Sequence, residues 1–309
     1  MKAVTPATVS VIMPTLARPE RASSLFRAIE SVTCQEGVRC VPLVVVNGAF
    51  ASADVRASIE GRPGIRVITL AMAGLPGALK AGRAAVETPY FAVLDDDDEL
   101  LPRALATRLQ ALDDRAADVV VTNGYRQGFG RRELDFEDFR PIRADPLRTI
   151  VRRNWLRPCA GLFRSRAVPF DLFAGIPEYR EWTYLGLRLA LERTIHFVEE
   201  ATYVYHTDTP GSLSGSKEYC LAGPRAIARM LELALPSDVR LMLHDHLAAD
   251  LHSASDWELL DRNYLAAWWW HLKCLARPGG WRYLSYTRRL LAAAWRRPSA
   301  ATSPPASSG

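Results

Sequence analysis

The chain has 309 residues, of which 49% are hydrophobic and 24% charged, and its formal net charge is +5. This composition is typical of a globular protein and excludes a largely disordered chain. The five cysteines are odd in number and form no Cys-x-x-Cys pair, which argues against a disulfide framework or a cysteine zinc site and favours a reducing cytosol.

The N-terminal end offers only a short apolar core, residues 9–15, VSVIMPT. A signal peptide needs a longer uninterrupted apolar run, and a membrane-spanning helix needs about 20 such residues. We therefore expect a cytoplasmic protein with no membrane-spanning segment at this end.

Short β-rich runs alternate with helical stretches along the first 122 residues. Strands are predicted at 9–14, 41–46, 65–70, 90–94 and 117–122, and helices near Pro19 and over 51–60, 75–87 and 100–112. In the first helix Leu25, Ile29 and Val32 would form the inner face. The alternation predicts an α/β fold whose mainly parallel central sheet is flanked by helices.

Ligands of open parallel sheets bind beyond the carboxyl ends of the strands. The loops at Thr15, Asn47 and Asp95 follow three of the predicted strands. We therefore expect these loops to meet at one site.

Residues 90–102, YFAVLDDDDELLP, carry a buried strand directly into four successive aspartates. Two carboxylates roughly 4 Å apart repel by about 4 kcal/mol at an effective dielectric constant near 20, so this segment needs a counter-charge. Mg²⁺ or Mn²⁺ supplies one, and its remaining coordination positions suit a diphosphate. In an extended segment Asp95 and Asp97 point together, while Asp96 faces a sugar or ribose hydroxyl.

The alternative interpretation is a solvated acidic turn before the next helix. For Asp98 and Glu99 this interpretation is preferred: they would cap a helix whose first turn holds Pro102.

Two nucleotide-binding motifs are missing from the sequence. No Gly-x-Gly-x-x-Gly follows the first strand, and the near match at 128–133, GFGRRE, lacks the third glycine. No Gly-x-x-x-x-Gly-Lys-Ser/Thr occurs either. A nicotinamide or flavin site and a Walker-type NTPase are therefore not indicated.

Two blocks of the sequence resemble family 2 glycosyltransferases, which are inverting enzymes with the GT-A fold. The opening VSVIMPTLARPERASSLFRAIESV is similar to the family's first strand and helix, and residues 70–105, LAMAGLPGALKAGRAAVETPYFAVLDDDDELLPRAL, resemble the block that ends in the metal-binding Asp-x-Asp element. The resemblance implies a GT-A domain over residues 1–218, a nucleotide-diphospho-sugar donor and Mg²⁺ or Mn²⁺.

Carried over by position, the resemblance implies roles for individual residues. Asp97 and Asp95 would hold the metal. Asn47 stands where the family has an acidic pair that reads the base, and Leu79 and Lys80 replace the usual Arg-Asn pair. The implied donor-site residues are Pro14, Thr15, Arg18, Asn47, Lys80, Asp95 and Asp96.

Residues 180–192, REWTYLGLRLALE, resemble the family's Glu-Asp element. Glu181 would then be the catalytic base that accepts the acceptor's proton, the alternative being a helix N-terminal acid stabilised by the helix dipole. Trp182 stands at the usual Asp position, where it would stack on the acceptor sugar or belong to the core. His206, before a Ser-rich loop, would complete the metal site, with Asp208 as the alternative ligand.

The C-terminal region is basic and rich in tryptophan. From Arg262 to Gly309 there are eight Lys or Arg and no acid, and five of the eight tryptophans lie there. We expect residues 219–309 to be a helical extension with a disordered end. A helix over 281–297 would bind an anionic membrane surface or pack on the catalytic domain; no nucleic-acid motif is present.

These features predict a metal-dependent inverting glycosyltransferase that acts on a hydroxyl of a glycan or lipid-linked acceptor, in the synthesis of cell-surface polysaccharide or lipopolysaccharide. The alternatives are a non-catalytic nucleotide-sugar or glycan-binding module on the same fold, and an aspartate-dependent phosphotransferase. The phosphotransferase would need its aspartates near the first strand.

Overall fold

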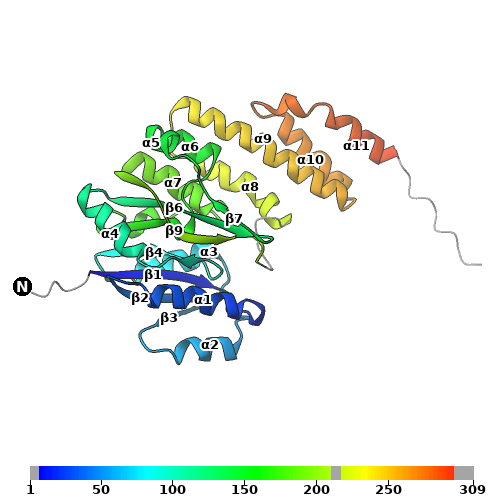
Figure 1. Ribbon diagram of the computed structural model, residues 1–309. Helices are drawn as coiled ribbons and strands as arrows, with labels where there is room; N and C mark the ends of the chain where they lie inside the picture. Colours follow the sequence, from blue (N-terminus) through cyan, green and yellow to red (C-terminus); the bar gives the residue numbers. More distant parts are fainter. Residues whose placement is uncertain (1–6, 210–216, 296–309) are drawn as a thin grey trace, which may run out of the picture.

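The computed structural model describes residues 7–209 and 217–295 of the chain (Figure 1). The Ser-rich loop with Ser212 and Ser214 and the predicted disordered end lie outside the described residues, as do Arg296 and Arg297.

The first four long strands form a parallel half-sheet. They are β1 (Thr8–Thr15), β2 (Arg39–Asn47), β3 (Arg66–Leu70) and β4 (Tyr90–Val93), in the spatial order β3-β2-β1-β4. Their cores are apolar because both faces are covered, and Val9, Ile12, Leu43, Val45 and Phe91 are fully buried. The predicted strands and their parallel pairing are confirmed.

The second half of the sheet is mixed. Next to β4 lies the antiparallel strand β8 (Gly161–Arg164), followed by β6 (Val119–Gly128) and β9 (Ile195–His206), which are parallel to each other. Two short strands, β5 (Glu99–Leu100) and β7 (Arg131–Leu134), pair antiparallel with β9 and β6. The described residues thus form a nine-stranded, mostly parallel sheet, as predicted.

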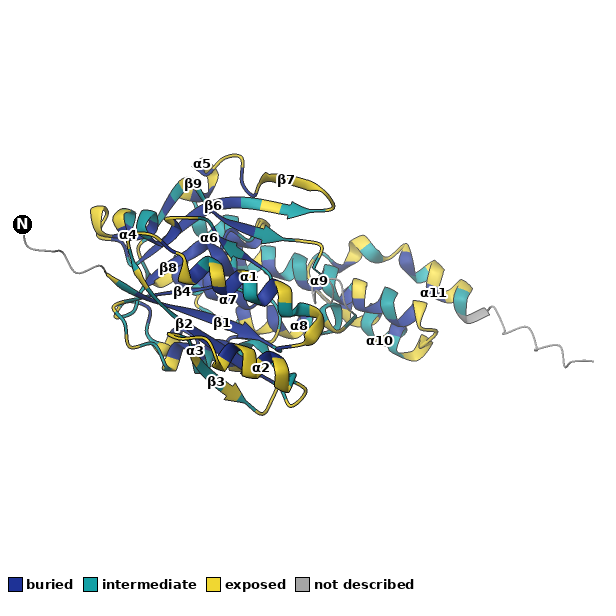
Figure 2. Ribbon diagram, turned by 60° about the horizontal axis from the view of Figure 1, so that its bottom comes forward, coloured by how far each residue is buried: buried dark blue, intermediate teal, exposed yellow. Residues whose placement is uncertain are grey.

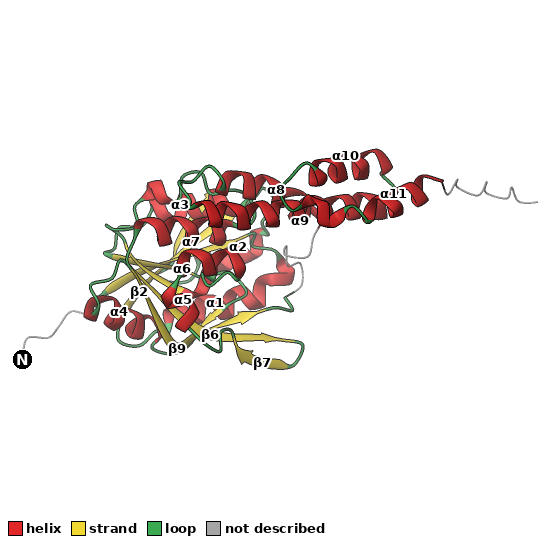
Figure 3. Ribbon diagram, turned by 90° about the horizontal axis from the view of Figure 1, so that it is seen from above, coloured by secondary structure: helices red, strands yellow, loops and turns green. Residues whose placement is uncertain are grey.

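Helices flank the sheet (Figure 3). In the predicted first helix, Leu25, Ile29 and Val32 are buried as expected. The α-helices before β9 are α1 (Ala22–Thr33), α2 (Ala53–Glu60), α3 (Leu75–Ala84), α4 (Ala104–Asp114), α5 (Arg140–Ala144), α6 (Pro146–Arg152) and α7 (Glu181–Glu192). The short 3-10 helices are η1 (Pro19–Arg21), η2 (Pro158–Ala160) and η3 (Phe170–Leu172).

The prediction of a helix over 100–112, capped by Asp98 or Glu99, is wrong at its start. Glu99 and Leu100 are a strand, β5, and α4 begins only at Ala104. The reason is long-range pairing, because Glu99 lies opposite Val204 of β9 and the Leu101 amide donates to the Thr202 carbonyl. Asp98 is fully buried and does not cap a helix.

In the described residues after β9, the α-helices are α8 (Lys217–Met230), α9 (Ser237–Leu260), α10 (Tyr264–Leu275) and α11 (Tyr286–Trp295), and the 3-10 helix η5 (Gly280–Tyr283) precedes α11. Figure 1 shows α10 and α11 farthest from the sheet. The helical nature of the C-terminal extension is confirmed. The domain boundary at 218/219 stays a prediction. Ile227 of α8 and Val239 of α9 belong to the same hydrophobic core as the sheet.

The predicted single helix over 281–297 is interrupted, because η5 ends at Tyr283 and α11 begins at Tyr286. Part of α11 packs on its neighbours, since Leu290 is buried with Leu259 of α9 and Ala267 of α10. None of the helices in the described residues combines the length and the apolar composition that a membrane span requires.

Candidate functional site

The carboxyl ends of β1, β2 and β4 meet, as the sequence predicts, and Asn47 joins two of the loops to α3. Its side-chain amide donates to the Thr15 carbonyl at 3.0 Å, and its Oδ1 accepts from the Gly74 amide at the start of α3, also at 3.0 Å. Asn47 is buried, so it fixes the backbone on either side of the site. Asn47 stands where the family has its base-reading acidic pair. Here its side chain is hydrogen-bonded to backbone groups of the protein, those of Thr15 and Gly74.

Three carboxylates gather just beyond β4. Oxygens of Asp95, Asp97 and Asp98 lie within 4.8 Å of one another, a spacing that suits a single cation. We name these three residues the acidic cluster. The expected pairing of Asp95 with Asp97 is present, and Asp98 joins them although the sequence had suggested a capping role for it.

The acidic cluster carries more negative charge than its surroundings balance. Burial, followed by the neighbouring carboxylates, raises the pKa of Asp95 well above its usual range, and burial followed by Asp97 does the same for Asp98. Asp98 Oδ1 accepts from the His206 amide at 3.0 Å, whereas no side-chain hydrogen bond is made by its buried Oδ2 within residues 7–209 and 217–295. The nearby Cys159 thiol favours the ionised form of Asp98 and so opposes the rise of its pKa. A buried carboxylate oxygen without a donor fits Mg²⁺ or Mn²⁺ bound here.

The Asp96 carboxylate is held by residues at the end of β1 and in η1. Its Oδ2 accepts from the Thr15 hydroxyl at 2.7 Å, and Oδ1 forms an ion pair with Arg21, which also lies 3.1 Å from Asp97. Burial raises the pKa of Asp96, and Arg21 and Thr15 oppose that shift. The contact explains why Thr15 and Asp96 belong to one site although 81 positions separate them.

Arg21 was missed by the sequence analysis. It ends η1, and its side chain reaches the acidic residues because α1, which follows directly, packs against β5 just beyond them. The sequence feature that could have pointed to Arg21 is its place in the first helical turn after Pro19, six residues beyond the strand that ends at Thr15.

His206 lies beside the acidic cluster, but its ring faces another residue. The imidazole Nε2 is 2.8 Å from Glu99 Oε1, and Glu99 is also paired with Arg27 at 2.8 Å. It is the backbone amide of His206 that reaches the cluster, through Asp98. The alternative ligand, Asp208, instead accepts from the Phe129 amide in the turn between β6 and β7.

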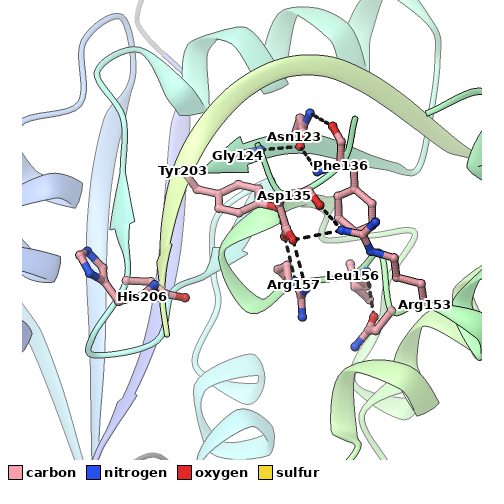
Figure 4. Close-up of polar contacts among 11 residues, drawn as sticks. Asn123, Gly124, Asp135, Phe136, Arg153, Leu156, Arg157, Tyr203 and His206 are labelled. Atoms are coloured by element: carbon pink, nitrogen blue, oxygen red, sulfur yellow. Dashed lines mark hydrogen bonds and ion pairs between the residues drawn. The ribbon is translucent and has the colours of Figure 1, made fainter. Parts of the chain in front are cut away.

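A second polar network is centred on Asp135, between Arg157 and Tyr203 (Figure 4). The fully buried side chain of Asp135 accepts two hydrogen bonds from Arg157, at 2.9 and 3.1 Å, and one from the Tyr203 hydroxyl at 2.9 Å. Arg157 also acts to lower the pKa of Asp98. Asp135 thus holds the Arg157 guanidinium in place, near enough to Asp98 to favour its ionised form.

Glu181 begins α7 and is 8% exposed. Its Oε1 accepts from the Tyr179 amide at 2.9 Å, which fixes the direction of the carboxylate. Burial raises the pKa of Glu181 to about 6, although the amides of Glu181 and Tyr179 favour the charged form. A carboxylate with that pKa is suited to accept a proton near neutral pH.

Trp182 packs into the main hydrophobic core, and its Nε1 has no hydrogen-bond partner among the described residues. Its expected contact with an acceptor stays a prediction. Of the other implied donor-site residues, Pro14 is buried in β1, Arg18 is exposed before η1, and Lys80 is half-buried on α3.

Comparisons with known proteins agree with this geometry. The sequence profile described as Glycosyl transferase family 2 matches residues 10–168, more than half of the chain. The chain is 37% identical over 105 residues to the succinoglycan biosynthesis protein ExoO of Rhizobium meliloti (strain 1021). That alignment covers 33% of this chain and 30% of ExoO, so it spans less than a third of the relative.

The fold is similar to that of S. aureus TarS. A structure of TarS 1–349 in complex with UDP-GlcNAc matches with a TM-score of 0.59 and 16% identity, covering 79% of this chain and 72% of that one. The complex of the same fragment with UDP matches with a TM-score of 0.54 and 15% identity, covering 79% and 71%. At this level of identity the similarity shows the GT-A-like fold alone.

Proposed function

Because the chain belongs to glycosyl transferase family 2, we propose that this glycosyltransferase uses a divalent metal ion and transfers a sugar, with inversion, from a nucleotide-diphosphate donor to a hydroxyl group. The observation that carries the metal-dependent part is the acidic cluster at the carboxyl end of β4, with the unpaired buried oxygen of Asp98. Of the three carboxylates, only Asp97 pairs with an arginine within the described residues, so a bound cation would relieve the remaining repulsion.

Asp95, Asp97 and Asp98 would hold Mg²⁺ or Mn²⁺, which when bound offsets the charge of the departing diphosphate. Asp96 has a different role. Anchored by Thr15 and Arg21, it presents a fixed carboxylate to a ribose or sugar hydroxyl of the donor. Lys80 and Arg18 are the cations that would approach the phosphates from α3 and from the loop after β1.

Glu181 would accept the proton of the acceptor hydroxyl as its oxygen attacks the anomeric carbon from the face opposite the leaving group. The hydrogen bond from Tyr179 orients the carboxylate, and its burial raises the pKa to about 6. Both properties suit a general base, which contributes typically 10²- to 10⁴-fold to a reaction rate.

The two named relatives support a narrower proposal about substrates. TarS binds UDP and UDP-GlcNAc in the solved structures, and ExoO is a succinoglycan biosynthesis protein. We propose a UDP-sugar as donor and a growing cell-surface glycan, free or lipid-linked, as acceptor. We also propose a cytoplasmic location, where nucleotide sugars are available.

The exposed apolar residues of the C-terminal helices support a peripheral position at the membrane. Trp281, Leu284 and Leu291 are each more than half exposed, and the stretch from Arg262 to Trp295 contains no acidic residue. Tryptophan and basic residues together favour the surface of an anionic bilayer.

Thermal unfolding in the presence of UDP-sugars, with and without Mn²⁺, tests the metal-dependent proposal. A ligand that binds the native state alone stabilises it by about 2.7 kcal/mol at a concentration one hundred times its Kd. We expect a UDP-sugar to raise the Tm in the presence of Mn²⁺ and much less in its absence, with release of UDP on incubation.

The matched variants are Asp97→Asn, in the acidic cluster, and Asp114→Asn, an exposed aspartate at the end of α4. Asp97→Asn should lose the Mn²⁺-dependent shift and UDP release while Asp114→Asn keeps both. Equal turnover by the two variants would remove the metal assignment.

A further inference from the structure

The turn before Glu181 has an unusual backbone. Tyr179 and Arg180 both have positive φ angles, 62° and 58°, and neither is glycine. Such residues cost of order 1–3 kcal/mol each and persist only where the surroundings hold them. This turn also supplies the Tyr179 amide that orients the Glu181 carboxylate.

The contacts that hold this turn come from the C-terminal helices. Arg180 Nη2 lies 2.7 and 2.8 Å from the two carboxylate oxygens of Asp250 in α9. The Tyr179 ring packs edge-on against Tyr219 of α8, with centroids 5.5 Å apart, and the Arg180 guanidinium lies 5.8 Å from the same ring. Figure 1 shows α8 beside α9, and α8 is also in contact with α7.

The Asp250 carboxylate is itself confined. Its side chain is 16% exposed, and it packs so closely on Gly223 of α8 that a Cβ at that position would overlap Oδ2. Two helices that contribute no residue to the acidic cluster therefore build the socket for Arg180.

We propose that Asp250 and Arg180 are positioning residues for the proposed reaction: by pairing, they lock the Tyr179–Arg180 turn and so aim Glu181 at the acceptor hydroxyl. The inference rests on the proposed role of Glu181. Under this proposal α8 and α9 affect catalysis by fixing the direction of Glu181, although neither helix touches substrate.

The test compares two variants of the socket with a matched control in the same helix. Asp250→Asn removes the charge that Arg180 needs, and Gly223→Ala displaces the carboxylate while leaving it chemically intact. The control, Asp256→Asn, removes another α9 aspartate that pairs with an arginine; its partner is Arg289 of α11, at 2.7 Å, and not a residue of the Tyr179–Arg180 turn.

Two measurements are made on the full-length chain with Mn²⁺ and UDP-sugar. Without a glycan, water takes the place of the acceptor hydroxyl: it attacks the anomeric carbon, Glu181 takes its proton and UDP leaves. We expect kcat for this UDP release to fall at least about tenfold in Asp250→Asn and in Gly223→Ala, within the contribution of a general base, with the donor KM nearly unchanged. Amide hydrogen exchange in residues 177–185 should become faster in both variants, and Asp256→Asn should match the unsubstituted protein in both measurements.

Wild-type kcat in both socket variants, or unchanged exchange in residues 177–185, would overturn the inference. A structural effect alone would lower the Tm and the amount of active protein but leave kcat per folded molecule unaltered. Glu181→Gln separates the two proposals: if it turns over at the wild-type rate, the role of Glu181 fails, whereas an inactive Glu181→Gln beside an unaffected Asp250→Asn removes only the positioning role.

Discussion

Glu181 illustrates how one residue can be placed for chemistry at a cost in stability. Burial raises its pKa from 4.5 to about 6, so the folded protein binds the proton more tightly than the unfolded chain does. The protonated Glu181 carboxyl makes its full contribution to the free energy of unfolding below pH 4.5. That contribution is lost as the pH rises through about 6. At neutral pH the ionised side chain therefore destabilises the fold.

The pH dependence of catalysis should follow the same pKa. Because the base must be ionised, kcat/KM for sugar transfer should fall below about pH 6. A pH–rate profile between pH 4.5 and 8 checks this. Glu178→Gln is the control, because Glu178 is exposed and lies three residues before Glu181. The Glu178→Gln variant should stay active, and its rate should fall at the same pH as in the unsubstituted protein or at a slightly lower pH. A profile of the unsubstituted protein that is flat down to pH 4.5 would contradict the assignment of Glu181 as the base.

Glu181→Gln should be inactive and yet more stable at high pH. A difference of roughly 1.5 pKa units corresponds to about 2 kcal/mol, so the variant should gain up to that amount in free energy of unfolding at pH 7.5. At pH 4.5 the gain should vanish. Urea unfolding at the two pH values measures it, and an equal effect at both would show that burial of charge is not the cause.

At the scale of the element, α3 shows how helix packing sets the position of the site. It begins at the loop that Asn47 holds and packs on β1, where a Cβ added at Gly82 would overlap the buried Ile12 side chain. Gly77, in the first part of the same helix, has open space around it. The packing of α3 therefore leaves no room for a side chain at Gly82, whereas a side chain at Gly77 would meet no neighbour.

Gly82→Ala should destabilise the protein by about 1–3 kcal/mol, since overpacking forces β1 and α3 apart. Gly77→Ala should stabilise it by up to about 1 kcal/mol, because alanine favours the helix and meets no neighbour. Urea unfolding of both variants checks the pair. Equal effects of the same sign would mean that helix propensity alone governs α3.

Over the whole molecule, the C-terminal helices form the part that projects from the sheet, and exposed positions recur along α10 and α11 (Figure 2). Their packing on α9 uses Tyr286 and Leu290, which leaves Trp281 70% and Leu284 58% exposed. These two side chains are the ones that a membrane surface would cover.

The double variant Trp281→Glu/Leu284→Glu should bind anionic vesicles at least about tenfold more weakly than the unsubstituted protein, because each added charge opposes binding by about 1 kcal/mol and the buried apolar area is lost. Phe50→Glu is the control, since Phe50 is 94% exposed but lies before α2. Sedimentation with anionic and zwitterionic vesicles measures binding. Equal binding by all three proteins would assign this surface a different role.

The sequence by itself determined the alternating strands and helices, the parallel half-sheet and the meeting of the Thr15, Asn47 and Asp95 loops, because apolar periodicity and the order of strands are local properties of the chain. The density of charge at 95–98 likewise indicated a cation site before any contact was known.

Tertiary structure alone decided which residues complete the site. Pairing of Glu99 with β9 buried Asp98 and moved the start of α4 to Ala104. Arg21 reaches Asp96 across 75 positions, and Asp250 holds Arg180 across 70. Such contacts depend on where distant segments pack, and burial, which sets the pKa of Glu181, exists only once they have packed.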